Sequence, residues 1–542
     1  MIISKITEKA KTKKKLNFGQ YGDSRFSTLK EIKSQYKEID ATRKSYSHEG
    51  GTIVARYKGK LYIDDDTVNT IVLGMTRSGK GELYVLPMID VLSRSIKKPS
   101  LVINDMKGEL VTAAADRLKE RGYDVHIFNL LDPSRSMQVN LLDPIAEQWN
   151  KGNKDEAQLM VRSITHTIFP SEEMGDDVYW REGAVSLVNG FILGCLTIFQ
   201  GNRDKLTLPY LALHMQYVST QIDGFDNFFA LLSKEDPGRV EASTFLSGGE
   251  KQRSSFLSIA SSKLRNFTME KFQMMMSRST LDFSMIGFSD RPQAIFLVIP
   301  DYDSSNHYLA SLIVKQIYDA NIKKASSEKG QKTRRRIHFL FDEFGNMPAI
   351  ADMGSTVTAG LSRGMIFHLI LQDFEQLKKR YPSDASTIKS NCGNLLYILS
   401  KDPDSLKYIS DACGFITTET FSGGQDGENI TMSVIERPLI SIDELQTLKL
   451  WETIFIRSSK RVDCKGKPII PYPIDNRKKT KLKPRFEYLS EDFPLGHVSL
   501  SEITDKYYPR YEPQQGPKYE KEEHLLDKME YQSKKPRGTI NF

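Results

Sequence analysis

One short stretch, 70-TIVLGMTRSGKGELYVLP-87, constrains the fold of this chain more than any other. It contains the pattern G-x-x-x-x-G-K from Gly74 to Lys80, directly after an apolar run typical of a strand and before a segment that predicts a helix from Glu82 onward. The glycines allow the backbone N–H groups to turn around phosphate groups, and the amino end of the following helix adds partial positive charge. The stretch therefore predicts a phosphate-binding loop inside an α/β layered domain.

The residues expected to contact ATP are those of this loop and of the first helical turn. They are Gly74, Thr76, Arg77, Ser78, Gly79, Lys80, Gly81 and Glu82. Lys80 is expected to reach the β and γ phosphates, whereas Gly81 stands where a Ser or Thr usually gives Mg²⁺ a hydroxyl ligand. Because Mg²⁺ usually keeps several waters, a water can fill that position, and we expect retained nucleotide binding with slow hydrolysis.

A second apolar run ends in acidic residues, as expected of the strand that lies beside a phosphate-binding loop. In 336-RIHFLFDEFGNMP-348 the acidic pair Asp342 and Glu343 follows five strand-like residues. Ligands of open α/β sheets bind at the carboxyl ends of the strands, so the pair is expected beside the loop. Asp342 is predicted to support Mg²⁺, and Glu343 to orient and deprotonate the attacking water.

Further apolar runs predict one mostly parallel sheet, because they are continuous rather than alternating and therefore suit strands covered by helices on both faces. The expected strands are 70–74, 100–105, 124–130, 294–300, 337–341, 366–371, 394–399 and 453–458. Helix-like spacing in 156–169 and 253–267, with no strand pattern between about 147 and 285, predicts an all-alpha insertion.

These patterns divide the chain into five segments that include two folded domains, within the range of about two to four domains that the length suggests. We expect a basic arm at 1–50, a nucleotide-binding domain in two pieces at 51–146 and 286–475, the all-alpha domain at 147–285, and a charged, extended tail at 476–542. The run Lys13–Lys15 in the arm predicts a solvated segment or a contact with phosphate or lipid headgroups.

Composition excludes few classes of protein. The 542 residues carry a formal net charge of +7, which is compatible with nucleic acid or an anionic membrane surface but diagnostic of neither. Four scattered cysteines favour a reducing compartment over a disulfide framework or a zinc site. The apolar span 183–199 is short for a membrane crossing and is expected to be a buried helix.

Several segments together resemble one known family, the TraG/TraD-like coupling-protein ATPases of conjugation and type IV secretion. The resemblance runs from about Asn69 to Pro473, with the matching segments in the order of the family. They are TRSGKG (76–81), VINDMKGEL (102–110), QVNLLDPI (138–145), VYWREGA (178–184), DEFGNMP (342–348), LILQDFEQL (369–377) and IERPLISIDELQTL (435–448). Glycine after the lysine is common in this family, so the resemblance makes Gly81 an inherited feature.

The resemblance implies a RecA-like motor domain that assembles as a hexamer and uses ATP to move or license single-stranded DNA bound to a relaxase. Gln372 resembles the polar residue that senses the γ-phosphate, and Arg363 is a candidate finger that reaches a neighbouring subunit's site. Asp105 and Lys107 match the family's D-x-KGE segment, where a structural link is as plausible as a catalytic role.

Family members commonly begin with membrane-spanning helices, and no such span is found here. The sequence therefore predicts a soluble variant, cytoplasmic and peripherally attached to the inner face of the membrane. A separate small membrane anchor protein or direct docking on the type IV secretion channel ATPase would recruit it, with help from the basic arm on anionic lipid.

Candidate DNA contacts are Lys263 and Arg265 in the insertion and Arg334–Arg336 before the acidic strand, although the last cluster is also compatible with an exposed loop. Two other functions stay open. One is a nucleotide-binding receptor platform with little turnover; the other is a chromosome-segregation motor, which the KGE segment fits less well.

Overall fold

The structure is a computed structural model, which describes residues 19–42, 44–170, 178–303, 305–423 and 430–509. Its centre is a nine-stranded sheet of order β16-β15-β12-β5-β11-β10-β7-β9-β8. From β12 to β8 all neighbours are parallel, and β15 and β16 add an antiparallel edge. The bounds are β5 (Thr70–Gly74), β7 (Ser100–Asp105), β8 (Asp124–Asn129), β9 (Gln293–Val298), β10 (Ile337–Phe341), β11 (Met365–Leu371), β12 (Asn394–Leu399), β15 (Ile454–Arg457) and β16 (Ile474–Asp475). Every strand predicted from the sequence is confirmed within this sheet.

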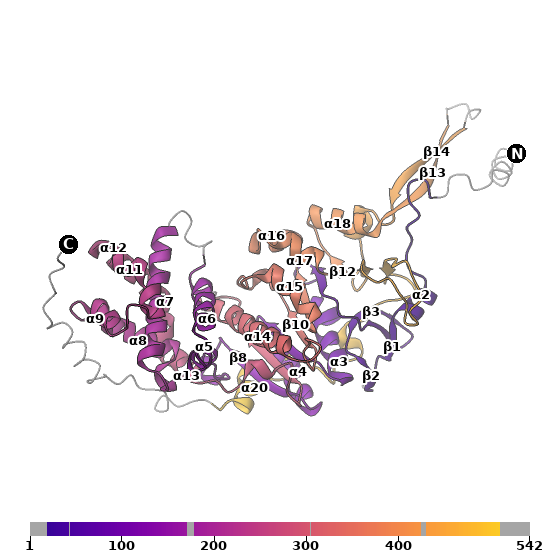
Figure 1. Cartoon of the computed structure of the whole chain (residues 1–542). Helices are drawn as coiled ribbons and strands as arrows, with labels where there is room; N and C mark the ends of the chain where they lie inside the picture. The colour runs from indigo at the N-terminus through magenta and orange to yellow at the C-terminus, as the bar shows by residue number, and fades with distance from the viewer. Residues whose placement is uncertain (1–18, 43, 171–177, 304, 424–429, 510–542) are drawn as a thin grey trace.

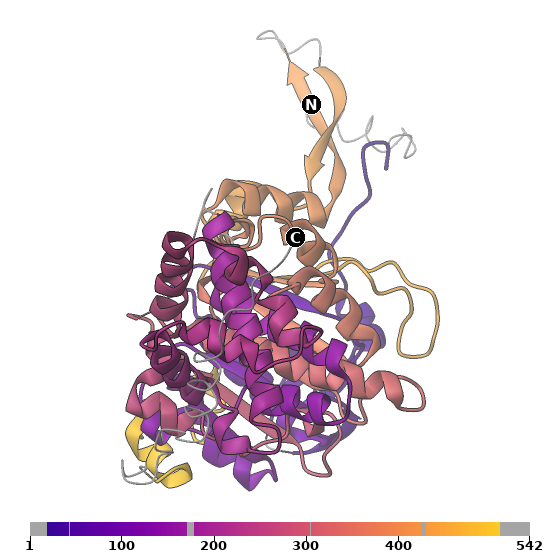
Figure 2. The same ribbon diagram turned by 60° about the vertical axis from the view of Figure 1, so that its left-hand side comes forward.

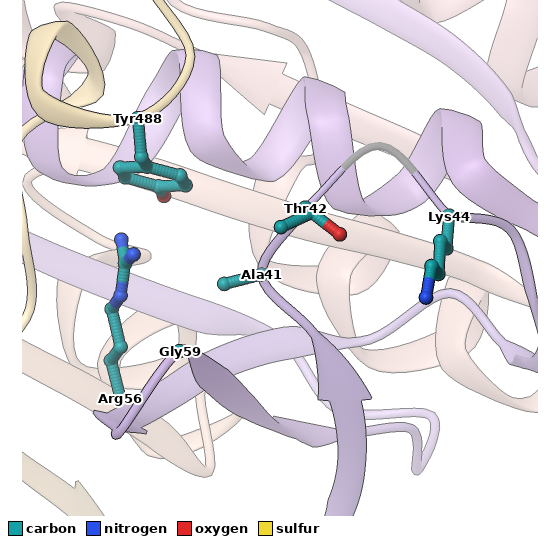
Figure 3. A pocket seen from close by; sticks show the side chains of 6 residues that line it. All are labelled: Ala41, Thr42, Lys44, Arg56, Gly59 and Tyr488. Carbon is teal, nitrogen blue, oxygen red and sulfur yellow. The ribbon is translucent and has the colours of Figure 1, made fainter.

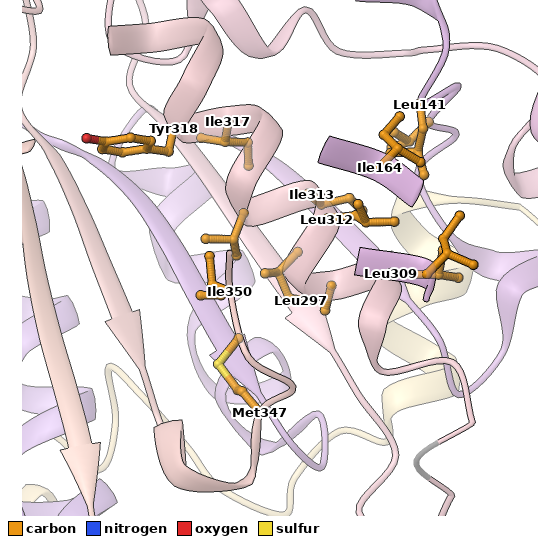
Figure 4. Close-up of a cluster of buried hydrophobic side chains, with 14 of the residues drawn as sticks. Leu141, Ile164, Leu297, Leu309, Leu312, Ile313, Ile317, Tyr318, Met347 and Ile350 are labelled. Carbon is orange, nitrogen blue, oxygen red and sulfur yellow. The ribbon is translucent and has the colours of Figure 1, made fainter. Parts of the chain in front are cut away.

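Helices cover both faces of the sheet, which explains why its strands are continuously apolar. On one face lie α3 (Leu86–Arg94) and α4 (Glu109–Glu120), whose buried side chains share a core with alternate residues of β5, β7 and β9. The other face is covered by α14 (Tyr308–Ser327), α15 (Met353–Ser362), α16 (Phe374–Arg380), α17 (Ala385–Ser390) and α18 (Pro403–Cys413). Figure 4 shows α14 with Leu297 of β9 on one side and Ile164 of the helical region on the other.

A helical lobe lies at one end of the molecule (Figures 1 and 2), and it occupies the sequence between β8 and β9, where an all-alpha insertion was predicted. Its helices are α5 (Asp143–Asn150), α6 (Lys154–Ile168), α7 (Val178–Ile198), α8 (Leu208–Ser219), α9 (Gly224–Ala230), α10 (Pro237–Glu241), α11 (Ser243–Ser247), α12 (Glu250–Leu264) and α13 (Glu270–Met275). The exact division into domains stays a prediction.

The central helix of this lobe, α7, is the one described helix with the length and composition of a membrane span. In its most apolar window 83% of the residues are buried inside the protein. The side chains pack against α6, α10, α11 and α12, as in the core of a folded domain. The expectation of a buried helix over 183–199 is confirmed.

The sequence did not predict several small elements outside the main sheet. Residues 29–64 contain α2 (Leu29–Gln35) and strands β1 (Lys37–Asp40), β3 (Thr52–Tyr57) and β4 (Lys60–Asp64) of a small sheet, while β2 (Tyr46–Glu49) pairs with β6 (Ser95–Lys97). The second half of the predicted basic arm is thus folded, and Lys9–Lys15 lie outside the described residues. A hairpin of β13 (Phe415–Gly423) and β14 (Ile430–Pro438), with α19 (Ile442–Gln446) after it, projects from the body (Figure 1).

The segment from 477 to 508, here called the C-terminal strap, differs from the extended tail that was predicted. It contains a short 3-10 turn at Arg485–Glu487 and ends in α20 (Leu500–Tyr507), which packs on α4. Four of its apolar residues are buried in the same core as α3 and α4; they are Leu482, Leu489, Phe493 and Ile503. Burying these side chains stabilises the strap against the sheet domain, while residues 510–542 lie outside the described residues.

Candidate functional site

The phosphate loop connects the end of β5 to the helix that begins at Gly81 with a π-helical turn (Gly81–Val85). Gly79 has φ +84° and Arg77 has φ +65°, so the backbone turns through the left-handed region twice. A Cβ added to Gly74 would lie 2.6 Å from Ser78 Oγ and 2.8 Å from Lys80 Cγ. Only glycine at position 74 allows the loop to close this tightly over its own lysine.

The loop presents polar groups that suit a phosphate ligand. The hydroxyl of Ser78 is buried and has no hydrogen-bond partner in the described structure. A buried orphan hydroxyl costs free energy unless a ligand satisfies it. Lys80 is only 6% exposed, and its ammonium group points to the acidic strand end.

The predicted acidic pair does lie beside this loop. Strand β11 separates β5 from β10, and because all three are parallel, Gly74, Gln372 and Asp342 lie at the same carboxyl edge. Lys80 Nζ is 3.0 Å from Glu343 Oε1, and Gln372 Nε2 donates to Glu343 Oε2 at 3.1 Å. The structure therefore brings together the lysine, the glutamate and the glutamine that the sequence singled out.

Asp342 occupies a different electrostatic environment from its neighbour. The protein that surrounds its carboxyl group, together with the carboxylate of Glu343, raises the pKa of Asp342 to about 7. The backbone carbonyl of Asp342 accepts a hydrogen bond from Asn104, the residue before the end of β7. A cation beside Asp342 would favour its ionised form, as expected of a carboxylate that supports Mg²⁺.

A model of the family described as type IV secretory system conjugative DNA transfer matches residues 23–474. The chain belongs to this conjugative DNA transfer family. Its relatives include the conjugal transfer protein TraG of Escherichia coli, 25% identical over 68% of this chain and 60% of the relative. Protein VirD4 of Agrobacterium fabrum is 22% identical over 74% of this chain and 58% of the relative. The chain thus spans about three fifths of the length of these curated relatives.

Solved structures confirm the predicted fold class, a RecA-like P-loop NTPase domain with a mostly parallel sheet and an inserted all-alpha region. The unbound bacterial conjugative coupling protein TrwB superposes with a TM-score of 0.58 at 15% identity, covering 87% of this chain and 99% of that one. TrwB in complex with ADP and Mg²⁺ gives a TM-score of 0.57 at 14% identity, covering 86% of this chain and 97% of that one.

Asp105 of the family's D-x-KGE segment binds backbone N–H groups through its carboxylate. It is 2% exposed, and its two oxygens accept from the N–H groups of Gly108 at 2.9 Å and Val111 at 2.8 Å. The carboxylate thus connects the end of β7 to the start of α4. Lys107 is exposed, and its Nζ lies 3.6 Å from Asp301 Oδ2. The geometry therefore favours a structural link over a catalytic role for this segment.

Arg363 lies at the opposite edge of the sheet from the phosphate loop. It precedes β11, and its guanidinium donates to the backbone carbonyl and Oε1 of Gln331. It does not contact the site of its own chain, so a finger role requires a neighbouring subunit and stays a prediction.

Of the candidate DNA contacts, Arg334–Arg336 lie before β10, at the amino edge of the sheet, while Lys263 and Arg265 belong to the helical lobe; their role stays a prediction. Arg335 donates to the backbone carbonyls of Lys98 and Asp290, and Arg336 to that of Asp65, so both brace the amino end of β10. Arg334 and Arg265 are exposed.

Two residues that sequence reasoning missed lie against the loop. The first is Arg485 of the C-terminal strap, whose Nη2 lies 2.9 Å from Glu82 Oε1; the expected contact of Glu82 with nucleotide stays a prediction. Trp451 lies on Gly79, where an added Cβ would be 2.4 Å from its ring. The apolar residues after Arg485, Phe486 and Leu489 among them, were the available signal that this segment is folded. No comparable signal marked Trp451.

A separate hollow of about 490 Å³ lies between the small sheet and the strap (Figure 3). Its lining consists of Ala41, Thr42, Lys44, Arg56, Gly59 and Tyr488. The guanidinium of Arg56 lies 3.9 Å from the centre of the Tyr488 ring. This stacking attaches the strap to β3.

Proposed function

We propose that this chain is a conjugative coupling protein, an ATPase that recruits a relaxase–DNA complex and drives or licenses its passage into a type IV secretion channel. The observation that carries the proposal is the Lys80–Glu343–Gln372 cluster at the carboxyl edge of β5, β11 and β10. A purely passive platform would not need a carboxylate and a glutamine arranged beside the lysine of a phosphate loop.

We assign each residue of the site a separate role in hydrolysis. The loop amides and Lys80 bind the phosphates, and Ser78 Oγ can donate to a phosphate oxygen. Asp342 would hold Mg²⁺, which neutralises developing charge on the phosphates when bound. Glu343 orients and deprotonates the attacking water. Gln372, which donates a hydrogen bond to Glu343, senses the γ-phosphate at the end of β11.

The partners follow from family membership and belong to the proposal. They are single-stranded DNA with its relaxase, the channel ATPase and a separate small membrane anchor protein, with a hexamer as the active form. TrwB was solved with ADP and Mg²⁺ and with non-hydrolysable ATP and GTP analogues, which supports ATP and Mg²⁺ as ligands here. We place the protein in the cytoplasm, peripherally on the inner face of the membrane.

The decisive experiment is ATP turnover by the purified full chain, with and without single-stranded DNA, followed together with oligomer size. The proposal expects turnover that rises with DNA and is lost in Lys80→Ala. Relaxase binding that survives Lys80→Ala, together with negligible turnover in the parent, would instead establish the receptor platform.

A further inference from the structure

Trp451 is held against the phosphate loop in an unusual conformation. Its φ of +70° lies in the left-handed region, which bulky residues rarely adopt and which persists only where the surroundings fix it. The turn is closed by Glu452, whose N–H donates to the carbonyl of Lys449 and whose carboxylate accepts from the N–H of Lys449, both at 2.9 Å. The ring is thereby positioned on Gly79.

A second ring stands next to the first and comes from the C-terminal strap. The Phe486 ring lies edge-on to Trp451, with centroids 5.8 Å apart and planes at 69°. Glu82, in the first turn after the loop, accepts from the guanidinium of Arg485 and from the N–H of Phe486. Phe486 is nevertheless 51% exposed and Trp451 is only partly buried, so both rings are accessible to solvent beside the phosphate loop.

The order of the strands places these rings and the catalytic carboxylate on opposite sides of the phosphate loop. Glu343 follows β10, two strands from β5 on one side, and Trp451 precedes β15, two strands from β5 on the other. Because β15 is antiparallel, its start at Ile454 pairs with Tyr397 of β12 at the same carboxyl edge. With about 4.8 Å between strands, the ends of β10 and β15 lie roughly 10 Å to either side of β5. From these two sides the Glu343 carboxylate reaches Lys80 and the Trp451 ring reaches Gly79.

We propose that Trp451 and Phe486 form a platform on which the base of a purine nucleotide stacks. The inference rests on the proposed function, since it needs a nucleotide whose γ-phosphate points to Glu343. The base of such a nucleotide extends the opposite way, toward the two rings. Aromatic faces bind the larger purine surface more strongly than a pyrimidine, so the platform distinguishes ATP and GTP from CTP and UTP.

The test compares ATP, CTP and inorganic tripolyphosphate as calorimetric ligands of the purified full chain. Tripolyphosphate engages the loop but has no base. In Trp451→Ala and Phe486→Ala we expect ATP to bind about tenfold more weakly, since one stacking contact is worth roughly that factor. Affinity for tripolyphosphate should stay at the parent value, and the preference for ATP over CTP should shrink.

Matched variants separate this inference from the proposed function. Trp451→Phe keeps an aromatic face and should retain most of the ATP affinity, and Leu450→Ala, which removes the neighbouring exposed apolar side chain, should leave it unchanged. Lys80→Ala should lose ATP and tripolyphosphate together, and failure of the parent to bind either would overturn the nucleotide site itself. The platform is wrong if Trp451→Ala weakens tripolyphosphate as much as ATP, or leaves ATP affinity at the parent value.

Discussion

Lys80 Nζ lies 3.0 Å from Glu343 Oε1, so the cation of the phosphate loop and the carboxylate after β10 neutralise each other across β11. Phosphate and Glu343 therefore compete for the same ammonium group. Both the affinity for ATP and its turnover depend on how that competition is resolved.

Glu343→Gln should bind ATP at least as tightly as the parent, because Lys80 is released from its ion pair. Turnover should fall by a factor of about 100 or more, since a positioned general base typically contributes that much. Calorimetric binding and steady-state phosphate release measure the two effects separately. Glu375→Gln, on the exposed side of α16, is the matched control and should change neither. A variant that loses binding and turnover together would show that Glu343 holds the loop in place instead.

Gly81→Ser is sterically free, since a Cβ at position 81 meets no other atom within 4 Å. The new hydroxyl would replace a water on Mg²⁺, and a contribution of roughly 1.4 kcal/mol would raise turnover about tenfold. Gly81→Ala adds the same Cβ without the oxygen and should stay near the parent rate. Equal rates in all three proteins would mean that water serves this position as well as a hydroxyl does.

The sheet could be predicted because each strand carries its own signal: continuous apolar residues, with chemistry at the carboxyl end. Once β5, β10 and β11 are parallel neighbours, Lys80, Asp342 and Gln372 must share one edge. The position of the strap could not be predicted in this way. Its attachment depends on contacts between residues far apart in the sequence, such as Glu82 with Arg485 and Arg56 with Tyr488, and local patterns contain no information on which acid or ring a given arginine will meet.

Arg485→Ala tests how far this strap supports the loop. Arg485 is 6% exposed, and its guanidinium donates both to Glu82 and to the carbonyl of Phe493. Its removal leaves that carbonyl without this donor and leaves Glu82 with the N–H of Phe486 alone. We expect a loss of about 2–4 kcal/mol in the free energy of unfolding, with weaker ATP binding. Lys483→Ala, which breaks an exposed ion pair with Glu487, should change stability by less than about 0.5 kcal/mol. Equal effects of the two substitutions would contradict a specific role for Arg485.

Asp105 should give stability a dependence on pH with a definite sign. Its burial raises the pKa to about 6, despite the hydrogen bonds from Gly108 and Val111, whereas an unfolded chain has an aspartate pKa of about 3.9. Between these values the folded protein binds the proton more tightly than the unfolded chain. The contribution of Asp105 is therefore most favourable below about pH 4, and it declines by roughly 3 kcal/mol by the time the pH passes 6.

Urea unfolding of the parent and of Asp105→Asn at several pH values isolates this effect, because Asn cannot ionise. The stability of the parent relative to Asp105→Asn should fall as the pH rises from 4 to 6 and level off above. Asp411→Asn, an exposed position on α18, should give a flat difference over the same range. A difference for Asp105→Asn that rises with pH would mean that the backbone donors at the start of α4 outweigh burial and hold this carboxylate ionised.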